Sequence, residues 1–114
     1  MKKSQSKKKI ISITLEPELV NIIDELVEIG ITESRTALIK KALKEELMWL
    51  HHAMNQWIEF KKGNISYDDY FITYVDGKGN IEKIPPIEKR LLFAFEKLGI
   101  EKVEDLKEKI KNVI

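Results

Sequence analysis

The stretch Lys7–Leu19, KKKIISITLEPEL, decides the fold of this 114-residue chain. The alternation puts apolar Ile11, Ile13 and Leu15 on one side, and the hydroxyl-bearing Ser12 and Thr14 on the other. Strict alternation of this kind predicts a short β-strand with one buried face. A single strand cannot satisfy its own backbone groups. We therefore expect it to pair with the same strand of a second chain, antiparallel about a two-fold axis.

The outward face of such a two-stranded ribbon would carry Ile10, Ser12 and Thr14 from each chain. A two-stranded ribbon fits the major groove of B-DNA, hydroxyl groups can bond base edges, and apolar groups can contact thymine methyls. These three residues are therefore predicted to read bases.

A basic arm precedes the strand, at residues 1–9. The formal net charge is only +1, yet residues 1–15 contain five lysines and no acidic residue. Such an arm commonly binds polyanions, although a short lysine run is also an ordinary solubilising tail. We predict that Lys7, Lys8 and Lys9 bind DNA phosphates.

The composition limits the class of protein. The chain contains no cysteine, which excludes a disulfide framework and a zinc ribbon. No apolar run reaches the roughly 18 residues of a membrane span, so we expect a cytoplasmic protein with no membrane partner. The length suits one domain or two very small units. Abundant Lys, Glu and Ile with only two Arg are typical of hyperthermophiles.

Helical periodicity follows the strand. Pro17 opens a first helix that ends at Gly30, and a long second helix runs from Ser34 to Gly63. Two short strands around an Asp-Gly turn come next, and helical patterns over 87–98 and 103–114 close the chain. The predicted class is mainly α with short β-strands, with a DNA-binding unit at 10–62 and a C-terminal extension at 63–114.

The order strand, helix, turn, helix resembles the ribbon-helix-helix family of transcriptional regulators, the MetJ/Arc superfamily. The resemblance covers residues 8 to about 50. It rests on IISITLEPEL, on the helix end at Gly30-Ile31, and on SRTALIKKAL, which is similar to the family's [ST]-R-[ST]-x-x-I-x-x-A-L. It implies an intertwined homodimer joined through an antiparallel ribbon.

The resemblance also implies site residues. It assigns base contacts to Ser12 and Thr14, and a phosphate clamp to Ser34, Arg35 and Thr36. Free amides and the dipole at a helix N-terminus form an anion site, which a hydroxyl group and an arginine strengthen. Ile10 departs from the family, whose members often carry Arg, Lys or Gln there, and this favours A·T-rich sites over guanine readout.

The C-terminal half looks like a degenerate second copy. A shift of 69 residues sets Pro17 on Pro86 and Gly30-Ile31 on Gly99-Ile100, with Ile81–Ile84 as a vestigial strand. The alternative is that any two amphipathic helical hairpins align tolerably. Glu101 and Lys102 would replace the clamp residues, so the copy is predicted to serve assembly rather than base reading.

Other candidate sites are weaker. Adjacent His51 and His52 point about 100° apart on a helix and cannot hold one metal together. Asp68-Asp69 has no neighbouring histidine or third ligand, so no metal, cofactor or catalytic site is predicted. The strand aromatics could stack on bases, but core and edge packing is favoured for Tyr67, Tyr70, Phe71 and Tyr74. Trp49 and Trp57 share a helix face and are predicted to pack against the C-terminal half or a partner.

The sequence therefore predicts a non-enzymatic, sequence-specific regulator of transcription, acting as a repressor. Its partners would be double-stranded DNA, at an A·T-rich or palindromic site, and further copies of itself in a homodimer or higher homo-oligomer. The alternative is an antitoxin whose C-terminal half binds a toxin protein. Antitoxin tails are typically unfolded and polar until bound, whereas this one has Phe93, Phe95 and periodic apolar positions.

Overall fold

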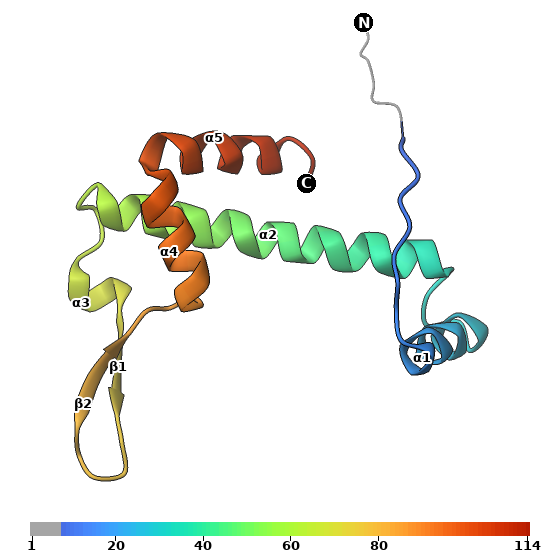
Figure 1. Cartoon of the computed structure of the whole chain (residues 1–114), viewed down its shortest axis with the longest axis horizontal. Coiled ribbons are helices and arrows are strands. Elements are labelled where there is room, and N and C mark those ends of the chain that lie inside the picture. The colour runs from blue at the N-terminus through green and yellow to red at the C-terminus, as the bar shows by residue number, and fades with distance from the viewer. Residues whose placement is uncertain (1–7) are drawn as a thin grey trace, which may run out of the picture. The chain divides into compact units, whose positions relative to one another are not determined.

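The computed structural model describes residues 8–114, so the role predicted for Lys7 lies outside the described residues. The elements, in chain order, are α1 Pro17–Glu28, α2 Arg35–Lys61, α3 Tyr67–Tyr70, β1 Ile72–Val75, β2 Ile81–Ile84, α4 Lys89–Leu98 and α5 Ile100–Lys111 (Figure 1). The predicted class, mainly α with short strands, is confirmed. The chain divides into an N-terminal unit, residues 1–40, and a C-terminal unit, residues 41–114, and α2 contributes to both.

Helix α1 begins and ends as its sequence predicts. Pro17 occupies the first turn, where its missing N–H costs nothing, and Glu18 complements the positive end of the helix dipole. At the other end Gly30 has φ 86°, and the N–H of Ile31 donates to the carbonyl of Leu26 at 2.9 Å. Glycine adopts this left-handed conformation at no steric cost, which explains why the helix stops there.

Helix α2 is 27 residues long and is capped at both ends. The Ser34 hydroxyl accepts a hydrogen bond from the backbone N–H of Ala37 at 3.0 Å, which is the bond of a helix N-cap. Gly63, with φ 83°, follows the last turn. The long second helix is thus confirmed.

The C-terminal unit has a hydrophobic core of its own. Its buried residues are Met54, Trp57, Ile58, Tyr70, Phe95 and Val103. The Trp57 and Phe95 rings lie 5.5 Å apart, and the Tyr70 ring stacks on Phe60 at 4.4 Å. Trp57 and Tyr70 therefore pack in the core, as predicted, whereas Trp49 remains 44% exposed.

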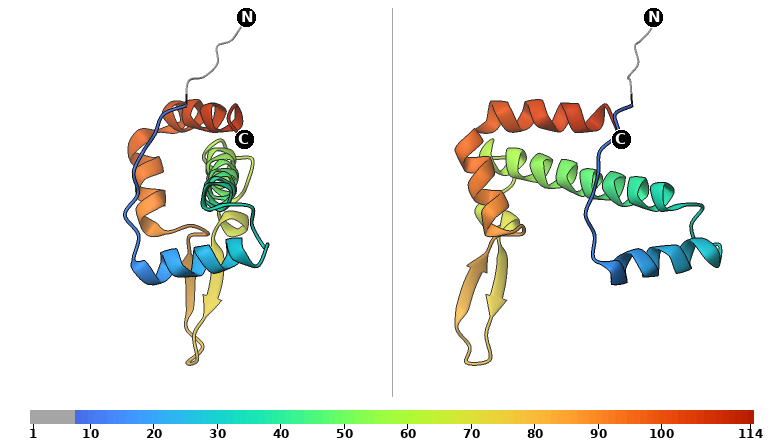
Figure 2. Two further views of the ribbon diagram at one scale, coloured as in Figure 1. Left: turned by 90° about the vertical axis from the view of Figure 1, so that its right-hand side faces the viewer. Right: turned by 45° about the vertical axis from the view of Figure 1, so that its right-hand side comes forward.

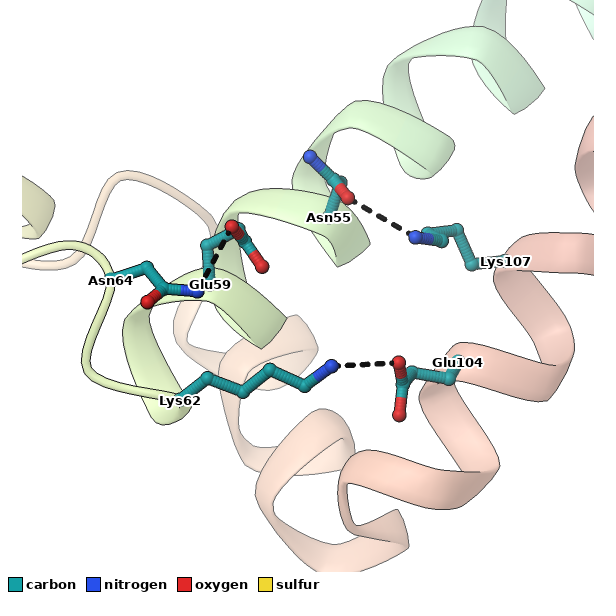
Figure 3. Close-up of polar contacts among 6 residues, drawn as sticks. All are labelled: Asn55, Glu59, Lys62, Asn64, Glu104 and Lys107. Carbon is teal, nitrogen blue, oxygen red and sulfur yellow. Dashed lines mark hydrogen bonds and ion pairs between the residues drawn. The ribbon is translucent and has the colours of Figure 1, made fainter.

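Polar contacts join α2 to α4 and α5 around this core. The Trp57 indole N–H donates to Glu96 at 3.0 Å, and Lys61 pairs with the same carboxylate at 3.0 Å. Figure 3 shows two contacts on the α5 side: Lys107 donates to the side-chain oxygen of Asn55, and Lys62, just beyond α2, pairs with Glu104. These contacts link the three helices, and the two lysine pairs, which are partly exposed, add modestly to the packing of the core.

The predicted hairpin is confirmed, with β1 and β2 antiparallel in the register Ile72↔Ile84 to Val75↔Ile81. Its turn spans Asp76 to Asn80, and the left-handed residue is Gly79, with φ 86°, rather than Gly77. The Asp76 carboxylate accepts hydrogen bonds from the backbone N–H groups of Asn80 and Lys78. The hydrogen bonds that Asp76 accepts from Asn80, and to a lesser degree from Lys78, lower the pKa of Asp76 below its ordinary value.

Two features of the C-terminal unit differ from expectation. Residues 67–70 form helix α3, where the sequence suggested only strands, because the Ser66 hydroxyl caps the segment by accepting from the N–H of Asp69 at 3.1 Å. Helix α5 begins at Ile100 directly after Gly99, whereas six residues separate α1 from α2. The proposed second copy therefore has a tighter turn than the first, and its origin as a repeat stays a prediction.

Candidate nucleic-acid interface

The segment 8–16 leads into α1 without forming regular secondary structure in the single chain. The predicted strand over 10–15 thus has no partner strand among the described residues. Its side chains are largely exposed: Ile10 is 100%, Ile11 76% and Ile13 54% accessible. Its pairing with a second chain remains a prediction.

The apolar side of this segment faces an open hollow of about 560 Å³ within the N-terminal unit. The apolar residues that line the hollow are Ile11, Ile13, Leu15, Val20, Ile23 and Ile39. Thr14 also borders it, together with Arg35 and Thr36. Ile11, Ile13 and Leu15 thus lie beside α1 and the start of α2, as expected for an inward face, but Thr14, predicted to face outward, borders the same hollow. The two-faced strand stays a prediction.

The residues predicted to touch DNA are accessible. Lys8, Lys9, Ile10, Ser12 and Thr14 are all exposed, as are Arg35 and Thr36 at the start of α2. Ser34 is half-buried, because its hydroxyl forms the N-cap of α2. The N–H of Ala37 is thereby engaged, whereas the Ser34 O–H, which only accepts in this bond, can still donate to a phosphate oxygen.

Arg35 has a partner that the sequence did not reveal. Its Nε and one terminal nitrogen donate to the two carboxylate oxygens of Asp24 at 2.6 and 2.7 Å. This bidentate pair ties the start of α2 to α1. The hydrogen bonds from Arg35 lower the pKa of Asp24 below its ordinary value, and Asp24 in turn raises the pKa of Arg35.

No sequence signal pointed to Asp24, because the contact joins residues 11 apart across a turn. Helical periodicity relates residues three and four apart on one helix and is silent on contacts between helices. The pair is well exposed on both sides, so it contributes modestly to stability and is open to competition from another anion.

The comparisons with known proteins add no family to this description. Neither protein-family models, nor curated proteins, nor solved structures give a significant match. The likeness to ribbon-helix-helix proteins thus rests on the residues quoted above.

Neither a metal site nor a membrane-spanning helix is found among residues 8–114. No group of three or more His, Asp or Glu side chains in this range is placed to hold a metal ion. None of the helices in the same range has both the length and the hydrophobicity that a bilayer crossing requires.

If the predicted interface binds DNA as a homodimer, we expect Arg35→Ala to weaken binding on every sequence and to reduce the slope of log affinity against log salt by about two units. One phosphate contact is lost from each protomer while base contacts remain. Filter binding at several salt concentrations on specific and mixed duplexes measures both quantities. An unchanged slope would show that Arg35 acts only as the partner of Asp24.

The matched variant Asp24→Asn separates the two roles of Arg35. It removes the competing carboxylate and keeps the side chain's shape, so affinity should rise if Arg35 contacts phosphate. Glu25→Gln removes an equal charge from the adjacent, exposed position and controls for a general electrostatic gain. The gain from Asp24→Asn should disappear in an Arg35→Ala background.

Proposed function

We propose that this protein is a sequence-specific DNA-binding regulator of transcription that acts as a homodimer. The observation that carries the proposal is the N-terminal unit's lack of a core of its own. Ile23 is its one buried apolar side chain among residues 8–40, while Ile11, Ile13 and Ile22 are each more than half exposed. In a unit of this size, the burial of so little apolar surface cannot offset the conformational entropy that the backbone loses on folding.

A second copy would supply the missing burial. Antiparallel pairing of two 10–15 segments would satisfy their backbone groups and close the hollow with the partner's apolar side chains. The same pairing presents Ser12 and Thr14 of both chains in one row, which matches the width of the major groove. Lys8 and Lys9 then flank the row, where phosphates lie.

The charge distribution supports an electrostatic contribution to affinity. If Lys7, Lys8, Lys9 and the α2 N-terminus each contact one phosphate in both protomers, the dimer makes about eight contacts, and the salt slope is about −7. Specificity would come from Ser12 and Thr14 together with DNA shape. Repression by occupying a promoter is the simplest mechanism.

The antitoxin alternative is less well supported. It requires a C-terminal half that folds on its partner, whereas Trp57, Phe95, Ile58 and Val103 are at most 2% exposed in the C-terminal unit. A packed core of this kind folds without a partner.

The deciding experiment is a mobility shift of the purified chain on A·T-rich and mixed duplexes across salt, with the mass of the complex determined in the same samples. A discrete complex containing two chains, with affinity that depends on sequence and falls steeply with salt, is the expected result. No binding at low salt would overturn the proposal and favour a protein partner for the N-terminal unit.

Thr14→Ala should weaken binding to the preferred sequence by about 1 kcal/mol or more and leave nonspecific binding unchanged. The hydroxyl and methyl groups are predicted to contact base edges, whereas nonspecific binding depends on phosphates. Competition assays with specific and mixed duplexes measure the difference. Equal losses on all sequences would remove Thr14 from base reading.

A further inference from the structure

The hairpin formed by β1 and β2 stands out from the helices of the C-terminal unit (Figure 2). Apolar side chains are exposed on both of its faces: Ile72 and Tyr74 on one, at 55% and 49%, and Val75 and Ile81 on the other, at 58% and 72%. A two-stranded hairpin of this kind is only marginally stable by itself. Further strands at its edge would extend the sheet and cover part of this apolar surface.

The turn shows which backbone groups are free for such pairing. The N–H of Asp76 donates to the carbonyl of Asn80 at 3.0 Å, which makes these two residues a hydrogen-bonded pair. In an antiparallel ladder, hydrogen-bonded and non-hydrogen-bonded pairs alternate. The N–H and C=O groups of Thr73 and Val75 on β1 therefore point away from β2, and those of Ile81 and Lys83 on β2 point away from β1.

Symmetry and charge then distinguish the two edges. When identical strands pair antiparallel about a two-fold axis, the axis passes through one residue, which faces its own copy. Of the two most overlapping registers on β2, one places Glu82 against Glu82, and directly opposed like charges destabilise a sheet. The other places Lys83 against Lys83, and each of these side chains already contacts Asp68 and Thr73 of its own chain. Strand β1, with the sequence ITYV, has no charge to oppose pairing.

We propose that β1 pairs with β1 of a second copy, antiparallel, with Tyr74 on the two-fold axis. Thr73 of each chain then exchanges backbone hydrogen bonds with Val75 of the other, and the two Tyr74 rings become direct neighbours. The result is a four-stranded sheet in the order β2, β1, partner β1, partner β2.

This contact is small. Two four-residue edges bury well under the roughly 1,000 Å² of a stable interface, so the contact populates at high protein concentration or when chains are already held close together. The proposed pairing is inferred from the hairpin alone. Its functional role, which rests on the proposed function, is to join neighbouring dimers on DNA. Each chain would then have two distinct two-fold interfaces, an arrangement that extends along the duplex.

Cysteine cross-linking tests the register, because the chain has no cysteine of its own. In the proposed sheet the two Tyr74 positions form a non-hydrogen-bonded pair with Cα atoms about 4.5 Å apart, within disulfide range. We expect Tyr74→Cys to yield a disulfide-linked dimer under mild oxidation. Thr73→Cys, which in the proposed register faces Val75 of the second copy and not its own copy, should remain uncross-linked. Equal cross-linking of the two variants, or none for Tyr74→Cys, would overturn the proposal.

Proline substitution provides a second, matched test. Val75 and Ile81 are register partners whose N–H groups both point outward, so Val75→Pro and Ile81→Pro each remove one outward donor and no ladder bond. Val75→Pro should lower the weight-average mass in sedimentation at about 100 μM protein, whereas Ile81→Pro should not. Backbone NMR shifts of the hairpin establish that both variants keep it. Identical sedimentation of both variants and the unmodified chain would contradict pairing through β1.

These measurements use the protein without DNA, so they separate the two proposals. Tyr74→Cys cross-linking with no DNA binding would leave the hairpin contact standing and the regulator proposal lost. Specific DNA binding by a discrete two-chain complex, with no cross-linking of Tyr74→Cys, would support the regulator proposal and overturn the hairpin contact.

Discussion

Trp57→Ala is expected to lower the free energy of unfolding of the C-terminal unit by about 3–5 kcal/mol. The Trp57 side chain is 1% exposed and packs against Phe95, so its removal leaves a cavity at the centre of the core. It also deprives the Glu96 carboxylate of its bond from the indole N–H. Urea unfolding followed by circular dichroism measures the loss without relying on tryptophan fluorescence.

Trp49→Ala is the matched control, because it removes the same side chain from the same helix. Trp49 is 44% exposed, so its loss should cost much less than the loss of Trp57. Trp57→Phe retains most of the ring volume but lacks the N–H donor, and should fall between the two. Equal destabilisation by Trp57→Ala and Trp49→Ala would contradict the core described here.

Helix ends could be predicted because their causes are local. Pro17 at a first turn, Gly30 and Gly63 after last turns, and Asp76 at a turn each act within a few residues of their own position. The same reasoning could have found α3, since Ser66 followed by Asp68 and Asp69 is a helix start with acidic residues in its first turn. The strand propensity of the following residues hid that signal.

Contacts between elements could not be predicted in the same way. The Asp24–Arg35 pair, the bond from Trp57 to Glu96 and the division of the chain within α2 depend on how helices pack. Periodicity identifies which face of a helix is apolar, not which other helix covers it. For the candidate interface, the sequence indicated residues that are accessible, but not the Asp24 carboxylate that pairs with Arg35.

Ile13→Asp should abolish both dimerisation and DNA binding, with dimer affinity falling by at least 100-fold. In the single chain Ile13 is 54% exposed, so a monomer would tolerate the substitution with little change in stability. In the proposed dimer both copies of the side chain are enclosed against the helices, and an unpaired carboxylate buried there costs several kcal/mol. Sedimentation at low micromolar protein, where the small hairpin contact is not populated, measures the dimer alone.

Ser12→Asp is the control that separates the two faces of the segment. It adds the same charge one residue away, on the side predicted to face DNA, so the dimer should persist while DNA binding is lost by repulsion from phosphates. The alternation requires these opposite outcomes, because neighbouring residues of a strand point to opposite faces. A chain that remains dimeric with Asp at position 13 would place the two-fold contact elsewhere, and the ribbon could not then form the DNA-reading surface.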